Sequence, residues 1–263
     1  MKAPRFSRKT LCIPYAVFLL FFVLVPMAVI FVYAFTDADM HFSFWNFINF
    51  FSDPTKISTV IYSVVIALVT TVITLLIAYP AAYILARSKI KKRNVLLLLF
   101  VTPMWINFVL RINAIRELLN WIGLLGTANY FNTIFGMVYD FLPFMILPLY
   151  TTIQKIDESL YEASADLGGN RLTTFFRVTV PLSMPGIGSG ITMVFLPSMT
   201  NYVVSDMLGN SKVTIIGKFI ETYFGTDWHM GSMIALILLI VVFFSAWLSG
   251  GFKADETARG ANL

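Results

Sequence analysis

Long apolar runs without charged residues alternate with short polar segments along this chain. About 20 apolar residues cross the hydrocarbon core of a bilayer, so each run is a candidate transmembrane helix. The pattern predicts an all-α integral membrane protein with six transmembrane helices, joined in one domain over residues 10–252. Between the third and fourth runs, residues 112–131 are expected to form an outer loop that has room for a short interfacial helix. The six predicted helices cover residues 10–36, 57–86, 94–110, 132–153, 178–205 and 230–252.

Composition and charge agree with a membrane protein. Hydrophobic residues make up 58% of the chain and charged residues 13%, against roughly a quarter charged in soluble domains. The net charge of +5 does not indicate nucleic-acid binding, because the basic residues border the apolar runs. Cys12 is the one cysteine, and His41 and His229 are far apart in the sequence. The chain therefore predicts no intrachain disulfide and no metal site of its own.

The basic residues also predict the orientation. If the N-terminus is cytoplasmic, 14 of the 19 Lys and Arg residues fall on that side of the membrane. The positive-inside rule then places both termini in the cytoplasm, as an N-terminal segment 1–9 and a tail 253–263. The first run has the basic start of a signal peptide, but its 27 uncharged residues exceed the usual apolar core of about 7–15 residues. We expect an uncleaved anchor.

A charged loop, residues 154–181, lies on the predicted cytoplasmic side between two apolar runs. Ser159 and Glu162 have the S-x-x-E spacing of a capping box, which predicts a helix start. Gly168 and Gly169 predict the end of that helix, because glycine readily takes the left-handed conformation. The predicted helix carries an apolar stripe and an acidic stripe, and we expect a second short helix around Leu172, Phe175 and Phe176, ended by Pro181. The stripes consist of Leu160, Ala163 and Leu167, and of Glu158, Glu162 and Asp166.

The spacing within this loop resembles a known signature. Glu162-Ala163-Ser164, Gly168 and Val178-Thr179-Val180-Pro181 are similar to the E-A-A-x3-G-x9-I-x-L-P motif of membrane subunits of binding-protein-dependent ABC importers. Ser164, Val178 and Val180 depart conservatively from the motif. The resemblance implies that the loop docks into a separate ATPase subunit and transmits its motion. It assigns the coupling role to Glu162 and Gly168, with Ala163, Asp166 and Leu167 in the contact surface.

The chain itself lacks the G-x-x-x-x-G-K-[ST] phosphate loop. The resemblance therefore implies a non-catalytic subunit without a cofactor, whose ATP and magnesium are bound by the partner ATPase. Gly186, Gly188 and Gly190 resemble a nucleotide loop only faintly and lack its lysine. They are better explained as small residues that let transmembrane helices approach closely.

Five short segments carry a wider resemblance over roughly residues 57–250. The segments are Trp105-Ile106-Asn107 with Leu110-Arg111-Ile112, Leu142-Pro143-Phe144-Met145, Pro148-Leu149-Tyr150, Pro181–Gly186 and Val204–Gly209. In order and spacing they resemble the spermidine/putrescine (polyamine) permeases of the PotB type. The resemblance implies the type I permease fold in a bacterial cytoplasmic membrane. It further implies a homologous second permease subunit, an ABC ATPase dimer, an extracytoplasmic polyamine-binding protein and surrounding membrane lipid as partners.

A path for a cationic substrate should offer carboxylates and aromatic faces. Asp140 lies within the fourth predicted helix, where an acid is a functional candidate by default. Asp206, with Asn201 and Tyr202, is placed at the outer end of the fifth helix, and Trp105 near mid-membrane in the third. Each residue has an alternative explanation. Asp140 can pair with Arg111, Asp206 can be a solvated helix end, and Trp105 can be a packing residue.

Pro197 interrupts the fifth predicted helix about midway, and we interpret it as a flexible point in a moving helix. Three other functions remain open from the sequence. The first is the same kind of importer with another small solute. The second is an ion-driven secondary transporter, although the internal repeats typical of that class are not seen. The third is a membrane scaffold without transport.

Overall fold

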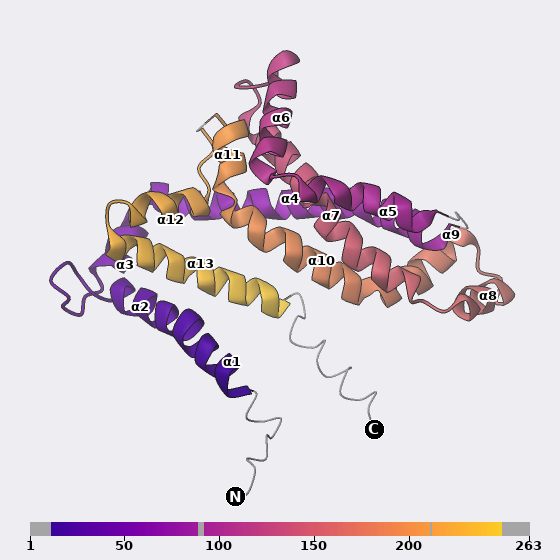
Figure 1. Cartoon of the computed structure of the whole chain (residues 1–263), viewed down its shortest axis with the longest axis horizontal. Helices are drawn as coiled ribbons and strands as arrows, with labels where there is room; N and C mark the ends of the chain where they lie inside the picture. The colour runs from indigo at the N-terminus through magenta and orange to yellow at the C-terminus, as the bar shows by residue number, and fades with distance from the viewer. Residues whose placement is uncertain (1–11, 89–91, 211, 249–263) are drawn as a thin grey trace, which may run out of the picture. The chain divides into compact units, whose positions relative to one another are not determined.

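The computed structural model describes residues 12–88, 92–210 and 212–248. Within them the regular structure is helical, apart from one isolated bridge between Thr36 and Phe42, which confirms the all-α prediction (Figure 1). The terminal segments 1–9 and 253–263, on which the predicted orientation depends, lie outside the described residues. The helices are α1 (Cys12–Leu19), α2 (Val25–Ala34), α3 (Trp45–Ser52), α4 (Pro54–Arg87), α5 (Arg93–Val101), α6 (Phe108–Trp121), α7 (Asn129–Gln154), α8 (Glu158–Asp166), α9 (Arg171–Thr174), α10 (Val180–Thr200), α11 (Tyr202–Leu208), α12 (Ile216–Phe224) and α13 (Trp228–Leu248).

Five of the six predicted apolar runs form helices long and apolar enough to cross a membrane. The first includes a π-helical turn, Leu20–Leu24, between α1 and α2. Pro26 lies at the start of α2 and donates no backbone hydrogen bond, which favours the wider π turn before it. The five candidate spans within the described residues are Cys12–Ala34, Pro54–Arg87, Asn129–Gln154, Arg171–Thr200 and Trp228–Ser245.

The predicted third helix, 94–110, is not a single straight helix. Its apolar part, Val95–Trp105, ends in a 3-10 turn, and a new helix over Phe108–Trp121 leaves at an angle of 94°. Pro103 has no N–H for the helix ladder, and the Asn107 side chain accepts a hydrogen bond from the Val109 amide at 2.9 Å, which caps the start of α6. The expected outer loop 112–131 is therefore helical over its first half, in α6.

The described residues form two compact units. One comprises the chain up to Ile57 together with Phe219–Ile240, and the other comprises Ser58–Lys218 together with the chain from Val241. In the first unit, the buried Asn46 side chain donates to the Thr36 carbonyl at 3.0 Å. His229 contacts the Thr36 hydroxyl through Nδ1 at 3.3 Å. These contacts join the end of α2 to α3 and to the start of α13.

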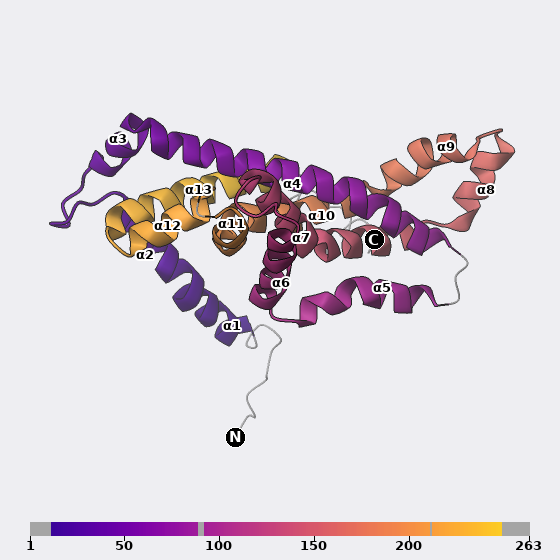
Figure 2. The same cartoon turned by 90° about the horizontal axis from the view of Figure 1, so that it is seen from above.

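The second unit is built around α7 and α10, which lie side by side in both views (Figures 1 and 2). Gly186 on α10 is buried, and a Cβ there would lie 2.7 Å from the Thr152 hydroxyl and 2.8 Å from the Pro148 carbonyl. A Cβ at Gly190 would likewise lie too close to the Met145 side chain. The small residues of α10 therefore allow close contact with α7, as the sequence predicts.

The second short helix expected in the charged loop does not stand alone. Arg171–Thr174 continues through a π-helical turn, Phe175–Thr179, into α10, so one helical segment of 30 residues runs from Arg171 to Thr200. Pro181 does not end a helix, because it directly follows the π-helical turn, whose wider winding accommodates a residue that donates no backbone hydrogen bond. At the other end, Asn201 separates α10 from α11, so the predicted run 178–205 is broken there.

Candidate functional site

The charged loop begins with a helix cap that differs from the predicted capping box. Ser159 lies inside α8 rather than before it, and the cap is Asp157, whose carboxylate accepts the Ser159 amide hydrogen at 2.9 Å. The predicted Ser159–Glu162 box is therefore wrong by two residues, because aspartate caps a helix start as well as serine does. The backbone N–H of Ser159, with help from its side chain, holds the pKa of Asp157 below its ordinary value.

The end of α8 has the predicted glycine geometry. Gly168 has φ +79°, in the left-handed region that favours glycine. Its N–H donates to the Ala165 carbonyl at 2.9 Å, and the Gly169 N–H donates to the Ser164 carbonyl at 2.8 Å. This pair of bonds is the Schellman motif, which stops the helix and turns the chain toward α9. No other part of the described chain comes within 4 Å of the position that a Gly168 side chain would occupy.

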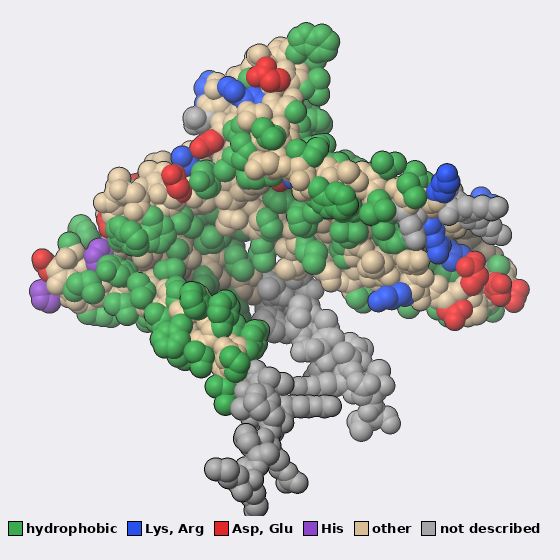
Figure 3. Space-filling model, in the orientation of Figure 1, with side chains coloured by type: hydrophobic (Ala, Val, Ile, Leu, Met, Phe, Trp, Pro, Cys, Tyr) green, Lys and Arg blue, Asp and Glu red, His purple; other side chains and the backbone are tan. Residues whose placement is uncertain are grey.

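All five residues predicted to couple to the ATPase are exposed. Glu162, Ala163, Asp166, Leu167 and Gly168 lie on α8 and on the turn after it, and Leu167 is 90% exposed. Acidic side chains gather over the tip of α8, as Figure 3 shows.

The same surface is hollowed between α8 and the segment that follows it. Leu160, Ser164, Arg177 and Val178 contribute to a groove of about 310 Å³. A hydrogen bond of 2.8 Å between the hydroxyls of Ser164 and Thr174 joins its two walls. An exposed apolar side chain beside acids and a groove is a surface suited to a protein partner.

A contact that the sequence did not reveal attaches α8 to a transmembrane helix. The guanidinium of Arg87, at the end of α4, forms two hydrogen bonds with the Glu158 carboxylate, at 3.1 and 2.9 Å. It also stacks on the Tyr161 ring, 3.6 Å from the ring centre. In the sequence, Arg87 contributes only to the predicted topology. A basic residue directly after a predicted helix, on the same side as an acidic loop, is the available signal.

Asp140 is not exposed to a path in this structure. Its carboxylate pairs with Arg111 on α6 at 2.6 Å, and both side chains are less than one tenth exposed. Arg111 Nε and Nη1 have no hydrogen-bond partner among the described residues. The sequence leaves two explanations for Asp140, an acid that lines a substrate path or a partner of Arg111. The geometry favours the pairing with Arg111. A cation could reach this acid only after the pair had opened.

Asn201, Tyr202 and Asp206 come together on one segment beyond α10. Asn201 separates the two helices, and its N–H donates to the Pro197 carbonyl at 2.8 Å. Tyr202 and Asp206 lie one helical turn apart on α11, and both contact Lys218. Within the second unit, this segment lies at the end of α10 opposite to α8 and α9 (Figure 1).

Trp105 is the last residue of the 3-10 turn before the break in the third predicted span. It is 78% exposed. Its position is therefore at a bend rather than within a straight helix, and its predicted part in a substrate path remains a prediction.

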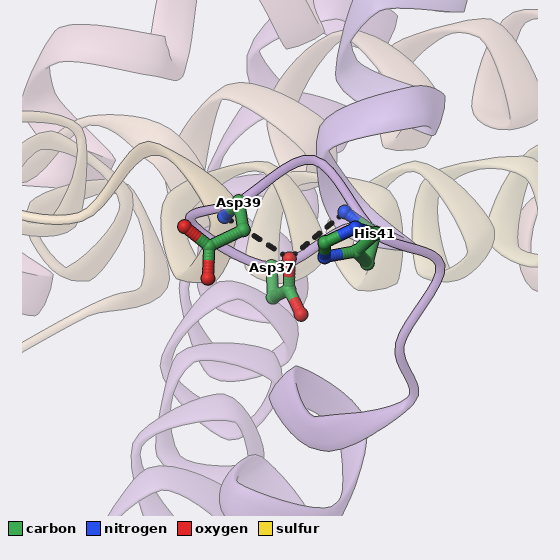
Figure 4. A group of neighbouring side chains, drawn as sticks. All are labelled: Asp37, Asp39 and His41. Carbon is green, nitrogen blue, oxygen red and sulfur yellow. Dashed lines mark hydrogen bonds between the residues drawn. The ribbon is translucent and has the colours of Figure 1, made fainter.

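Asp37, Asp39 and His41 form a cluster that the sequence did not single out (Figure 4). Their ligand atoms lie within 4.8 Å of one another, as in a metal site. However, one Asp37 oxygen already accepts hydrogen bonds from the Asp39 and His41 amides, at 3.1 and 2.9 Å. The hydrogen bonds of a tight turn account for the grouping.

Comparison with known proteins decides the family. Residues 78–252 match the family described as binding-protein-dependent transport system inner membrane component. The chain belongs to this family. Its membership makes the chain a multi-pass subunit of an inner-membrane ABC transporter, in agreement with its long apolar helices.

Members of the family with curated names are similar over most of their length. The spermidine/putrescine transport system permease protein PotB of Haemophilus influenzae is 36% identical over 271 residues, which cover 92% of this chain and 94% of that protein. The protein of the same name from Escherichia coli is 35% identical over 207 residues, 72% of this chain and 75% of that protein.

Solved structures show the same permease fold. A crystal structure of a bacterial ABC transporter involved in the import of the acidic polysaccharide alginate aligns with a TM-score of 0.69 at 18% identity, over 92% of this chain and 94% of that one. A second, of a bacterial alginate ABC transporter in complex with a pentasaccharide-bound periplasmic protein, aligns with a TM-score of 0.74 at 16% identity, over 95% of this chain and 94% of that one. At these identities the likeness concerns the fold alone.

Proposed function

We propose that this chain is the permease subunit of an ATP-driven importer that carries polyamines, spermidine or putrescine, across the bacterial cytoplasmic membrane. The observation that carries the proposal is the 36% identity to a spermidine/putrescine permease over nearly the whole of both chains. The exposed coupling surface on α8 supports the transport role independently. The subunit performs no covalent chemistry, and ATP and magnesium belong to its partner ATPase.

The proposed topology has six spans and two cytoplasmic termini. It counts the bent pair Val95–Trp105 and Phe108–Trp121 as one interrupted span. The bias of Lys and Arg then places α8 in the cytoplasm and the segment Asn201–Asp206 toward the outer side.

The proposed partners follow from the family and from the surfaces described. An ATPase dimer meets α8, where Leu167 and the groove beside Leu160 offer the apolar contacts. A homologous second permease completes the transmembrane path. An extracytoplasmic binding protein delivers the polyamine at the other side.

Arg87 gives the coupling a second route into the membrane. When the ATPases close, movement of α8 acts through the chain on α10 and through the Arg87–Glu158 and Arg87–Tyr161 contacts on α4. The two hydrogen bonds of the Schellman turn at Gly168 hold the end of α8 together while the helix moves. Trp105, Asn201, Tyr202 and Asp206 are the proposed lining of the path, and Asp140 joins them when its pair with Arg111 opens.

The test is the uptake of labelled spermidine into liposomes that hold the complex of both permeases and the ATPase, with the binding protein added outside. We expect ATP-dependent uptake that disappears when this subunit is omitted. Uptake that persists without this subunit, or uptake by this chain alone without ATP, would contradict the proposal. In the second case an ion-driven transporter would be the better description.

A further inference from the structure

Tyr202 and Asp206 already contact an alkylammonium group of the protein itself, the side-chain ammonium of Lys218. The ammonium of Lys218 lies 3.2 Å from the Asp206 carboxylate and 5.4 Å from the centre of the Tyr202 ring. Tyr202 and Asp206 are four residues apart on α11, so their side chains lie on one face. A carboxylate beside an aromatic face is a chemical environment that binds organic ammonium ions.

The frame around this group is fixed from both sides. On the inner face of α11, Val204 and Leu208 are fully buried and pack against Gly136 of α7. The Ser205 hydroxyl donates to the Val213 carbonyl. Two residues before Lys218, the Ile216 amide donates to the Ser63 hydroxyl of α4 at 2.7 Å. The helix that carries Tyr202 and Asp206, and the start of the helix that carries Lys218, are therefore held in place by buried contacts.

We propose that Tyr202 and Asp206 form a binding site for a primary alkylammonium group, and that Lys218 occupies it until the ammonium end of a polyamine displaces it. The inference rests on the proposed function and adds Lys218 as a tethered competitor. A lysine side chain is a four-carbon stem that ends in an ammonium. It therefore has the chemistry of one end of an alkyl diamine.

Solvent exposure distinguishes the Asp206 carboxylate from that of Asp140. The side chains of Lys218 and Asp206 are 34% and 32% exposed, so a soluble amine can approach the carboxylate while the lysine is bound. The Arg111–Asp140 pair is closed on all sides, with 7% and 6% exposed. Within the proposed path, the Asp206 site is the one a substrate can enter without a prior rearrangement of buried charges.

The direction of a mutational effect separates a competitor from a structural ion pair. If the pair only supports the fold, loss of either partner lowers the rate of transport. If Lys218 competes with substrate, its removal strengthens substrate binding and removal of Asp206 weakens it. Partly exposed ion pairs are weak, so the site is occupied by Lys218 for a moderate fraction of the time, and removal of the lysine should raise the apparent affinity about two- to sixfold.

The experiment measures initial spermidine uptake by the reconstituted complex at limiting concentrations of loaded binding protein. We expect Lys218→Gln to raise uptake about two- to sixfold and Asp206→Asn to lower it. Lys218→Gln should bring no gain in the Asp206→Asn background. Lys212→Gln, an exposed lysine of the preceding loop, is the matched control for loss of one positive charge and should leave uptake unchanged. Equal losses from Lys218→Gln and Asp206→Asn would overturn the proposal.

A labelling experiment tests the site without transport. Cys12 is the one native cysteine, so Lys218→Cys in a Cys12→Ser background places a single thiol beside Asp206. We expect putrescine to slow the reaction of this thiol with a thiosulfonate reagent, and Asp206→Asn to abolish the protection. Butanediol, which lacks the charge, should not protect. Lack of protection by putrescine, or equal protection after Asp206→Asn, would contradict the site.

The two experiments can fail separately. If the wild-type complex imports no polyamine, the proposed function is wrong, and the labelling result still reports on the ammonium site. If the wild type imports spermidine while Lys218→Gln has no effect on uptake, the role of Lys218 is wrong and the proposed function stands.

Discussion

The buried pair Arg111–Asp140 allows the sharpest prediction about the interior. The change is Asp140→Asn, which removes the negative charge and preserves the shape of the side chain. The two charged groups are 2.6 Å apart and less than one tenth exposed, and two further nitrogens of Arg111 already have no hydrogen-bond partner among the described residues. The substitution therefore leaves a buried guanidinium without compensation.

The expected magnitude follows from that burial. Removal of one partner from a buried ion pair costs about 3–5 kcal/mol, whereas replacement of both partners by apolar residues of similar size is often close to neutral. We expect Asp140→Asn, Asp140→Leu and Arg111→Met each to lower the free energy of unfolding by at least about this amount. The double variant Arg111→Met with Asp140→Leu should cost much less than the sum of its two single changes, Arg111→Met and Asp140→Leu.

The assay is a double-mutant cycle on the free energy of unfolding in mixed micelles, with spermidine uptake measured on the same variants. If Asp140 serves only the fold, the double variant regains both stability and uptake. If Asp140 also binds the substrate cation, the double variant regains stability and stays defective in uptake. A cost below about 1 kcal/mol for Asp140→Asn would refute the reasoning, because it would mean that the pair is solvated.

Three further predictions concern the coupling loop and the helix pair behind it. Replacement of Arg87 by Lys keeps the charge and loses the bidentate, stacked geometry, so the ATPase rate should persist while spermidine uptake per ATP falls; unchanged coupling would exclude the α4 route. Gly186→Val overpacks the contact between α7 and α10 and should cost about 1–3 kcal/mol, measured as loss of thermal stability, whereas the exposed Ser189→Val should cost little. The pKa of Asp157 is lowered in the folded protein, so its capping stabilises α8 above the unfolded pKa of about 3.9 and is lost as the pH falls through the folded pKa. Asp157→Ala should therefore reduce hydrogen-exchange protection of the first turn of α8 at pH 7, and this difference from wild type should shrink in acid; a difference that grew in acid would contradict the cap.

Periodicity and charge were sufficient to predict most of the long helices. Apolar runs of about 20 residues have few alternatives to a helix in a membrane, since every backbone polar group must be satisfied within the chain. The break after Trp105 was not predicted, because Pro103 and Asn107 are local signals inside a run without charged residues. They do not specify the angle of the bend, 94°, and α6 beyond it packs against α7 and α11, which are distant in the sequence.

At the coupling loop, the sequence predicts the helix end at Gly168, which depends on one residue. It does not predict contacts between side chains from two distant segments. Gly168 was predicted because a left-handed helix end has a local residue preference. The Arg87–Tyr161 contact joins residues 74 positions apart in the chain, and no spacing rule reveals it. The Lys218–Asp206 contact is of the same kind, since the sequence marks Lys218 only as a basic residue on the predicted outer side.

The central claim is that α8 couples ATP hydrolysis to polyamine import, and Gly168 tests it most directly. A Cβ added at Gly168 would have no described residue beyond its chain neighbours within 4 Å, so a substitution acts mainly through the backbone turn and the partner surface. A β-branched residue disfavours the left-handed conformation by about 1–2 kcal/mol, whereas Asn tolerates it. The measurement is ATP-dependent uptake of labelled spermidine by the reconstituted complex with Gly168→Val, with Gly168→Asn as the conformational control. We predict that uptake falls at least tenfold with Gly168→Val and less with Gly168→Asn, and undiminished uptake with Gly168→Val would contradict the coupling role.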